Sequence, residues 1–435
     1  MTLTITVHRG TQQIGGSCIE IAAENGERLI LDAGRPLDAP RGAAGLLPAT
    51  LDLSRAAHVI ISHPHMDHWG LVGELPANWP IWSGAFSERL MRLTAALFGD
   101  AFPAEIHTWN NRAPVLDIGG FRVTPFLTDH SAADAYMLLI ERDGIRVLYT
   151  GDFRAHGRKA ALVEAFLAHG PKEIDVLLME GTNLKSSKPV VRESALEERF
   201  VELARAVSGR IFVEWSAQNL DRTVTLYRAA RRSGRRLVVD LYTADVLLQA
   251  PDGSGLPRPD RHLFSSLLVM VTPGLARRYK AMGREDHLAR VLATGRATSR
   301  AQTAQHDAIV MTRASLLRDF ERGDVLRIGA DDAFVHSSWS GYLNEDDPRS
   351  PWVKAGAAGA RRELIHTSGH AGPADLARFA DKTAPRFLVP VHGVEWDAPG
   401  IALPPVMRLG DGQPWRIPTK PSSHYPTQAE GFDEG

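Results

Sequence analysis

The sequence predicts an α/β protein in which a second α/β unit is inserted into the first. Before Gly181, short apolar strands each give way to a small or polar residue. After Gly181, amphipathic helices alternate with apolar strands, which is typical of a parallel sheet. A strand followed by a histidine then returns near residue 387. With 435 residues, of which 44% are hydrophobic, the chain can bury the cores of two such units.

The opening region is expected to form strands joined by turns and short helices. Each strand is a short apolar run that includes β-branched residues and is bounded by turn-forming or charged residues. The expected strands are Thr4–Val7, Ile19–Ile21, Arg28–Leu31, Val59–Ile61, Phe121–Thr124, Arg146–Tyr149 and Asp175–Met179. Between them, Ser87–Leu97 is expected to be a helix.

The middle of the chain predicts its own alternating unit, followed by a return to the first. The expected elements are helix Glu193–Ala206, strand Arg210–Glu214, helix Leu220–Arg232, strand Arg236–Asp240 and strand Ile309–Met311. We assign the later strands Glu363–Ile365 and Arg386–Val389 to the first unit. The expected boundaries are therefore 1–183 and 363–418 for the first unit and 184–362 for the insertion, with a flexible polar tail at 419–435.

Charge and cysteine content restrict the class of protein. The formal net charge of −1 does not favour a nucleic-acid binder, although a local basic groove can exist on a neutral protein. The single cysteine, Cys18, excludes an internal disulfide and a cysteine zinc cage, and it fits a reducing compartment. The N-terminal segment does not resemble a secretory signal, and no apolar run approaches the roughly 20 residues of a membrane span. We expect a soluble cytoplasmic protein without a membrane partner, and a homo-oligomer is left open.

The segment His63-Pro64-His65-Met66-Asp67-His68 follows the expected strand Val59–Ile61. Imidazole and carboxylate are ligands that suit zinc, with manganese and iron as alternatives. Alternation along an extended chain places His63 and His65 on one side, and a bend then lets Asp67 and His68 face a second point. A histidine-rich surface loop is the competing interpretation. The pattern favours two metal ions, because other candidate ligands also follow strands.

Three later residues complete the expected ligand set. His130, Asp152 and His392 each follow an apolar strand, and strand ends of an α/β fold meet in one crevice. We expect His63, His65 and His130 at one metal, Asp67, His68 and His392 at the other, and Asp152 as a bridge between metals roughly 3.5–4 Å apart. Such a pair would generate a hydroxide near neutral pH. Taken singly, each of the three could be an ordinary turn or surface residue.

Asp32 ends the expected strand Arg28–Leu31 and has two interpretations of equal weight. It could orient a metal ligand from behind, or it could be a simple turn residue. Asp134, which follows His130 closely in the chain, is a weaker candidate of the same kind.

These residues together resemble the metallo-β-lactamase superfamily. The string His63-x-His65-x-Asp67-His68, with His130 and Asp152, matches its metal motifs, and Asp32 matches its first motif. The resemblance covers the chain as far as Glu180 and again its closing part, which carries His370 and His392. It implies an αββα sandwich that binds two divalent metal ions, but it says little about the substrate.

The long insertion and its flanks are similar to the β-CASP nucleases, and most of all to ribonuclease J. The matching segments are Glu180-Gly181-Thr182, Ser368-Gly369-His370 and Val391-His392-Gly393. The resemblance implies an inserted α/β β-CASP domain, with Glu180, His370 and Asp67 in catalysis. His370 paired with Glu180 would act as a general acid or hold the scissile phosphate. Glu180 departs from the aspartate expected in ribonuclease J, and because the chain ends soon after His392 we do not expect the C-terminal domain of that family.

Small polar residues near these motifs are candidates for phosphate or RNA binding. Ser368 and Gly369 precede an expected helix at Ala374–Ala380, and His366 could add a donor. Ser216 and Asn219 resemble a second backbone-binding loop, although N-capping explains them equally well. The inserted unit also concentrates positive charge at Arg222, Arg228, Arg231, Arg232, Arg235 and Arg236, which could line a groove or form a solvated helix face. Trp339 is a candidate base-stacking platform or a core residue.

The sequence thus predicts a metal-dependent ribonuclease that hydrolyses single-stranded RNA with a di-metal-activated hydroxide. The cut could be endonucleolytic or 5′-exonucleolytic. A DNA nuclease of repair or defence is the nearest alternative, since the chemistry would be the same. A small-molecule metallo-hydrolase is disfavoured by the insertion, and a non-catalytic scaffold is disfavoured by the complete ligand set.

Overall fold

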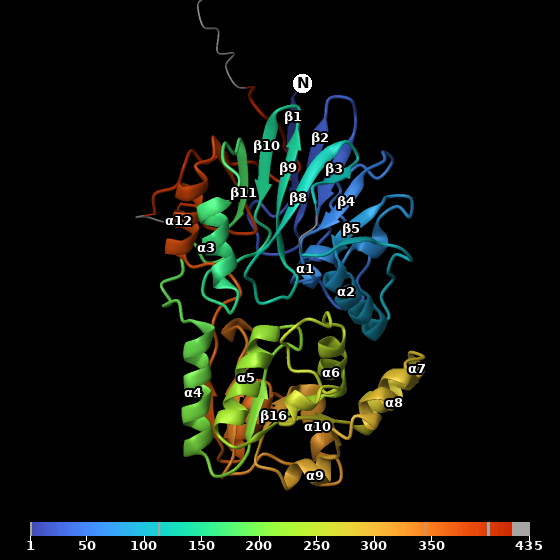
Figure 1. The fold of residues 1–435 in the computed structure, drawn as a ribbon, viewed down its shortest axis with the longest axis vertical. Coiled ribbons are helices and arrows are strands. Elements are labelled where there is room, and N and C mark those ends of the chain that lie inside the picture. Colours follow the sequence, from blue (N-terminus) through green and yellow to red (C-terminus); the bar gives the residue numbers. More distant parts are fainter. Residues whose placement is uncertain (1, 112–113, 344, 398–400, 420–435) are drawn as a thin grey trace, which may run out of the picture.

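The computed structural model describes residues 2–111, 114–343, 345–397 and 401–419. Within these residues the strands form three sheets. Two of them face each other in one unit, and the third forms a separate unit below them in Figure 1. The predicted α/β class is confirmed. The expected tail lies, except for residue 419, outside the described residues.

The first sheet combines the N-terminal strands with one strand from the end of the chain. In sheet order it consists of β20 (Pro414–Arg416), β1 (Leu3–Arg9), β2 (Cys18–Ala23), β3 (Arg28–Leu31), β4 (His58–Ile61), β5 (Ile81–Gly84) and β6 (His107–Trp109). The second sheet consists of β19 (Phe387–Val391), β11 (Val176–Glu180), β10 (Ile145–Tyr149), β9 (Tyr136–Arg142), β8 (Phe121–Leu127) and β7 (Leu116–Ile118). The C-terminal strands β19 and β20 therefore complete sheets that the strands from β1 to β11 begin.

Helices cover the outer faces of these two sheets, which gives the αββα sandwich that the resemblance implied. Apolar residues from both sheets form a shared inner core, as their alternation predicts. The first sheet packs outside on α1 (Met66–Trp69), η1 (Val72–Glu74) and α2 (Ala85–Phe98), and the second on α3 (Ala160–His169) and α12 (Pro373–Thr383). Figure 1 shows α3 and α12 on one flank and α1 and α2 on the other.

The third sheet is parallel in every described strand pair, as the alternating pattern predicted. Its order is β15 (Ala297–Thr298), β14 (Leu267–Met270), β13 (Arg236–Asp240), β16 (Ala308–Thr312), β12 (Ile211–Glu214), β17 (Ala333–His336) and β18 (Arg361–Leu364). Its helical elements are α4 (Glu193–Ala206), α5 (Leu220–Arg232), α6 (Leu241–Leu248), η2 (His262–Phe264), α7 (Pro273–Ala281), α8 (Glu285–Ala293), α9 (Arg300–Ala304), α10 (Ala314–Glu321), η3 (Ser340–Tyr342) and α11 (Pro351–Ala357). The bounds of α4, α5 and β13 are those expected from sequence.

One strand lies in a different sheet from the one expected. We assigned Glu363–Ile365 to the first unit, but β18 pairs with β17 in parallel, with Ala333 opposite Arg361. The strand is not buried like those of the sandwich, because its side chains are exposed or half-buried. It therefore forms the edge of the inserted sheet, and the chain returns to the sandwich only after it.

The two units are held together by packing and hydrogen bonds at α2. Apolar residues of α2 join the same core cluster as the helices of the inserted unit. Arg89 Nε donates to the carbonyl oxygen of Gln249 at 2.9 Å, and Gln218 Nε2 donates to Thr94 Oγ1 at 2.7 Å. Within the described ranges, none of the helices has the length and apolar character needed to cross a bilayer.

The arginines of the inserted unit do not form one surface, which corrects part of the charge interpretation. Arg222 is fully buried, and its Nε donates to Glu193 Oε1 at 2.8 Å. Arg235 is also buried and donates to backbone carbonyls at the end of α4. The sequence left open a groove lining or a solvated helix face at these positions, but both guanidinium groups instead satisfy buried acceptors. Neither can line a groove for a ligand.

Replacing Arg222 with methionine should destabilise the inserted unit. Breaking a buried pair leaves Glu193 with only the more distant Arg154, at 3.8 Å, as a cationic partner among the described residues, and losing one partner of such a pair typically costs about 3–5 kcal/mol. Burial would raise the pKa of Glu193, but Arg222 lowers it to about 2, so the contribution is present above pH 4.5 and is lost as the pH falls toward 2. Urea unfolding at pH 7 and pH 3 should show a large deficit that shrinks in acid. Arg228→Met is the control on the same helix, because its side chain is 57% exposed; an equal effect there would contradict the prediction.

Candidate metal centre

The histidine-rich segment lies where β4 ends and the short helix α1 begins. Ser62 and His63 leave the strand, and α1 starts at Met66, so that Asp67 and His68 lie in its first turn. Trp69 Nε1 donates to the carbonyl oxygen of Pro64 at 2.9 Å, which fixes the bend between the two pairs of candidate ligands. The predicted turn from extended chain to a second direction is therefore confirmed.

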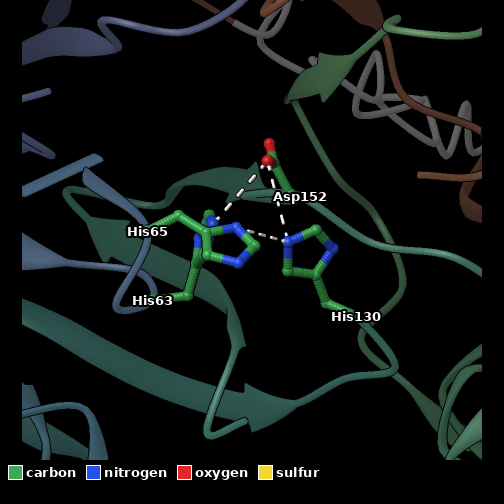
Figure 2. Close-up of side chains that lie close together, drawn as sticks. All are labelled: His63, His65, His130 and Asp152. Atoms are coloured by element: carbon green, nitrogen blue, oxygen red, sulfur yellow. Dashed lines mark hydrogen bonds and ion pairs between the residues drawn. The ribbon is translucent and has the colours of Figure 1, made fainter. Parts of the chain in front are cut away.

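The first candidate group consists of His63, His65, His130 and Asp152. Their potential ligand atoms all lie within 4.8 Å of one another. Figure 2 shows the three imidazoles and the carboxylate pointing toward one another. His65 Nδ1 lies 3.1 Å from His130 Nε2, and Asp152 Oδ2 lies 3.6 Å from His63 Nε2 and 3.9 Å from His130 Nε2. This group could hold one divalent cation.

The second candidate group consists of Asp67, His68 and His392. Asp67 Oδ2 lies 3.8 Å from His68 Nε2 and 3.3 Å from His392 Nε2. Asp152 connects the two groups, because its Oδ2 lies 3.2 Å from His68 Nε2 and its Oδ1 lies 3.6 Å from His392 Nδ1. The structure thus brings the predicted ligands together in the predicted two sets, with the carboxylate of Asp152 between them.

The donor atoms of these groups fit divalent cations. His63 Nε2, His68 Nε2 and Asp152 Oδ1 are buried without a hydrogen-bond partner among the described residues. Such atoms are costly to bury unless another group binds them. Burial lowers the pKa of His63 and His130 well below the usual value and that of His65 to about 4, so these rings are neutral. Neutral imidazole is the form that binds metal.

The carboxylates of the centre are ionised, as metal ligands must be. Burial would raise the pKa of Asp152, but His392 and His68 lower it well below the usual value. Burial likewise opposes ionisation of Asp67, and His68 lowers its pKa to about 2. Burial would lower the pKa of His68, but Asp152 and Asp32 raise it well above the usual value. A cation that binds His68 would therefore displace a proton.

Asp32 lies directly behind His68. His68 Nδ1 lies 2.7 Å from Asp32 Oδ2, which also accepts from Ser62 Oγ at 2.8 Å and from Tyr149 Oη at 2.7 Å. Because Asp32 contacts Nδ1, the Nε2 atom of His68 faces the second group. This is the arrangement expected if Asp32 orients His68 as a metal ligand. Asp134 is different: it accepts from the backbone N–H groups of Phe86 and Ser87 and thus caps α2.

His370 and Glu180 lie beside the second group. His370 Nδ1 lies 3.0 Å from Glu180 Oε2 and 3.8 Å from Asp152 Oδ2. Burial would lower the pKa of His370, but Glu180 and Asp152 raise it to about 9. Glu180 also accepts from the backbone N–H of Phe153 at 3.0 Å. With Asp152 and His392 they form a further group whose ligand atoms could hold a metal.

The residues expected to bind phosphate are only partly free to do so. The Gly369 carbonyl oxygen lies 2.7 Å from His130 Nδ1, and Ser368 Oγ accepts from Asn183 Nδ2 at 2.9 Å. Burial and Arg222 lower the pKa of His366 to about 3, so its ring is neutral. Asn219 accepts from the backbone N–H of Arg222 and caps α5, as the alternative interpretation held.

Ser216 precedes this cap and is exposed. Its Oγ accepts from the backbone N–H of Gln218 at 3.3 Å. Contact of these five residues with phosphate therefore stays a prediction.

Two residues that support the centre were missed in the sequence. Thr182 Oγ1 lies 3.0 Å from His392 Nδ1. Arg154 is fully buried and donates to the Ser368 carbonyl oxygen at 3.0 Å and to Asp221 Oδ2 at 2.6 Å. Thr182 and Arg154 each lie two residues after a predicted site residue, Glu180 and Asp152, and this was the available signal. Their partners lie far along the chain, so the contacts themselves could not be predicted.

Replacing Asp152 with asparagine should abolish tight metal binding. The amide keeps the shape but loses the charge that both groups share, so affinity should fall by more than the roughly 10–100-fold that loss of an outer partner costs. Zinc bound per chain after dialysis would measure this, with circular dichroism to confirm folding. Asp117→Asn, at an exposed position of β7, is the matched control; unchanged zinc content in Asp152→Asn would contradict the assignment.

Comparison with known proteins agrees with this geometry. Residues 13–198 match the metallo-beta-lactamase superfamily. Ribonuclease J 1 of Streptococcus pyogenes is 25% identical over 88% of this chain and 67% of its own length. The ribonucleases J of Sinorhizobium meliloti and Thermus thermophilus are each 24% identical, over 84% and 91% of this chain and 64% and 70% of their own lengths. The chain thus spans about two thirds of these relatives.

A solved structure shows the same fold over nearly the whole chain. It is a protein of unknown function from Enterococcus faecalis, with a TM-score of 0.74 and 20% identity, and the match covers 96% of this chain and all of that one. The superfamily match covers the histidine-rich segment, His130, Asp152 and Glu180, and the ribonuclease J matches extend across the inserted unit. Residues 13–198 thus match the metallo-β-lactamase superfamily, and most of the chain is similar in sequence to the ribonucleases J.

Proposed function

We propose that this protein is a metal-dependent ribonuclease that hydrolyses phosphodiester bonds of single-stranded RNA. The observation that carries the proposal is the His370–Glu180 pair, which adds a proton-bearing imidazole beside two groups of metal-binding side chains. A phosphodiester needs both charge neutralisation and a proton for its leaving oxygen. The names of the relatives, which are ribonucleases J, support RNA as the substrate.

The metal-binding groups would hold two divalent cations, with zinc as the first candidate and manganese as the alternative. When bound, they would supply Lewis acidity and a hydroxide nucleophile near neutral pH. Asp152 would keep the two groups at a fixed separation, since its oxygens face both of them. Asp67 would bind metal in the second group, where its carboxylate lies close to His392. From this position it would also orient the nucleophile.

His370 would donate a proton to the leaving 3′ oxygen. Its side chain is 21% exposed, whereas Glu180 is fully buried behind it. The Glu180 carboxylate therefore stabilises the protonated His370 ring from its buried side. The exposed side of the ring can face a substrate. Asn183 Nδ2 donates to the His370 carbonyl oxygen at 3.1 Å, which positions the backbone of this loop.

The RNA would lie between the two units. We place the sandwich at 1–183 and 365–418 and the inserted β-CASP unit at 184–364, because β18 pairs with β17 and so belongs to the inserted sheet. The carboxyl ends of the parallel third sheet would lie on the side of the metal-binding groups, since only a short segment joins the end of β18 to His370. The single cysteine supports action in the cytoplasm, where RNA is available.

His370→Ala should reduce turnover by about 10²–10⁴-fold, the usual effect of losing a general acid. Zinc content should stay at the wild-type level. His262→Ala, at an exposed position of η2, is the matched control. Loss of metal in His370→Ala would reassign the residue as a ligand.

The alkaline limb of the rate profile should depend on Glu180. His370 is protonated below its pKa, so activity should fall as the pH rises through that value. Glu180→Gln removes the largest favourable charge on the imidazolium, and the alkaline limb should move to lower pH. A pH–rate profile that is identical in both proteins would contradict the role of the pair.

Asp67→Ala should abolish cleavage of single-stranded RNA while the fold persists, with Asp117→Asn as control. End-labelled RNA with a 5′ monophosphate, triphosphate or hydroxyl should be incubated beside single-stranded DNA of the same sequence. Product sizes separate endonucleolytic from 5′-exonucleolytic cutting. Cleavage of DNA alone would replace the proposed substrate, and hydrolysis only of thioester or lactam substrates would remove the nuclease assignment.

A further inference from the structure

Two large aromatic side chains are exposed on the inserted unit. Trp339 is 56% exposed and Tyr342 is 65% exposed, so the indole is not a core residue. Their ring centroids are 5.2 Å apart and their planes are perpendicular. We refer to these two residues as the aromatic pair. Burying each ring against a ligand would remove substantial apolar surface from water.

The aromatic pair lies at the edge of the inserted sheet that faces the metal centre. η3 follows β17, whose neighbour β18 leads directly into the loop that carries His370. Parallel strands end at the same edge of a sheet, so η3 and this loop lie on the same side. In agreement, partial burial and the charge of the candidate metal ligand Asp67 raise the pKa of Tyr342.

The loop is built to hold the indole in place. His336 Nδ1 lies 3.0 Å from Glu214 Oε2, and its Nε2 lies 3.2 Å from the Trp339 carbonyl oxygen, so a buried imidazole supports the turn. Gly341 lies directly under the indole: a Cβ at this position would be 2.4 Å from the Trp339 ring. Any larger residue at 341 would therefore push the ring away.

A cation lies beside the pair. Lys188 Nζ is 3.4 Å from Ser340 Oγ and is exposed. An aromatic surface next to an ammonium group is the combination that binds single-stranded nucleic acid, because the rings stack with bases and the cation pairs with the phosphate backbone.

We propose that the aromatic pair is a nucleobase-binding site that holds one base of the RNA strand beside the metal centre. The inference rests on the proposed function for its ligand. Stacking does not depend on the identity of the base, so the site would set the position of the strand, and with it the bond that is cut, rather than a sequence preference. Trp339 and Tyr342 are thus positioning residues.

The test is equilibrium binding of a fluorescent single-stranded RNA by anisotropy, in the zinc-loaded His370→Ala protein, which should keep its metal ions and cut RNA only slowly. Trp339→Ala and Tyr342→Ala should each weaken binding by about 5- to 100-fold, whereas Tyr342→Phe should bind as the parent does. Gly341→Ala keeps both rings but displaces the indole, and it should approach the effect of Trp339→Ala. Leu263→Ala, which is 74% exposed on the same unit, is the control.

A set of RNAs with one abasic nucleotide, moved along the strand, then locates the base. The parent protein should bind more weakly when the abasic nucleotide stands at one particular position of the RNA. In Trp339→Ala, affinity should not depend on where the abasic nucleotide stands. Equal binding by parent and Trp339→Ala would overturn the inference. Weaker binding with an unchanged abasic profile would also overturn it, as would a change in oligomeric mass of Trp339→Ala by sedimentation, which would make the surface an interface between copies.

Failure of the proposed function is a separate result. The proposed function fails if the wild-type protein does not cleave RNA, whether or not substitutions in the aromatic pair change RNA binding. If wild-type protein cleaves RNA and the aromatic variants cut the same bonds with the same KM, the nuclease assignment stands and the nucleobase site does not. A shifted cleavage position with unchanged zinc content supports the site.

Discussion

The buried carboxylate of Asp152 is the constraint on which the site depends. A charged group with almost no exposed surface is stable only among opposite charges and donors. Here the imidazoles of His68, His392 and His370 surround it, and two further histidines approach its other side. These residues come from both ends of the chain. The sandwich must therefore close through β19 before the carboxylate is compensated, and folding of the C-terminal segment is coupled to assembly of the centre.

Much of the site was predictable because its members share a local rule: each follows a strand. The two ligand sets follow from strand ends that meet at one edge, whereas the pairing of His370 with Glu180 was implied by the resemblance to the β-CASP nucleases, and the contact of Asp32 with His68 was one of two interpretations. The helices α4 and α5 were predictable to the residue, because their apolar faces have clear periodicity. Features that depend on local residue spacing or on a local apolar pattern could therefore be predicted from the sequence.

The errors have a common physical origin in tertiary contacts. Nothing in the residues near Arg222 shows that Glu193 would accept from it, so a buried ion pair was indistinguishable from a solvated face. Strand β18 is polar and could be the edge strand of any of the sheets. Only its pairing with β17 assigns it to the inserted sheet. The supporting roles of Arg154 and Thr182 depend on partners in distant parts of the sequence, Asp221 and His392. Sequence identifies chemically unusual residues better than the ordinary residues that hold them.

The Gly369 carbonyl oxygen faces His130 Nδ1 from the loop through which the chain leaves the inserted unit. That loop is also tied to the inserted unit through Arg154, which bridges Ser368 and Asp221. Any rotation of one unit against the other therefore turns an imidazole of the first metal-binding group. By thermodynamic reciprocity, a change in this loop that alters the His130 contact would alter cation affinity at the first group, and cation binding there would in turn bias the position of the loop.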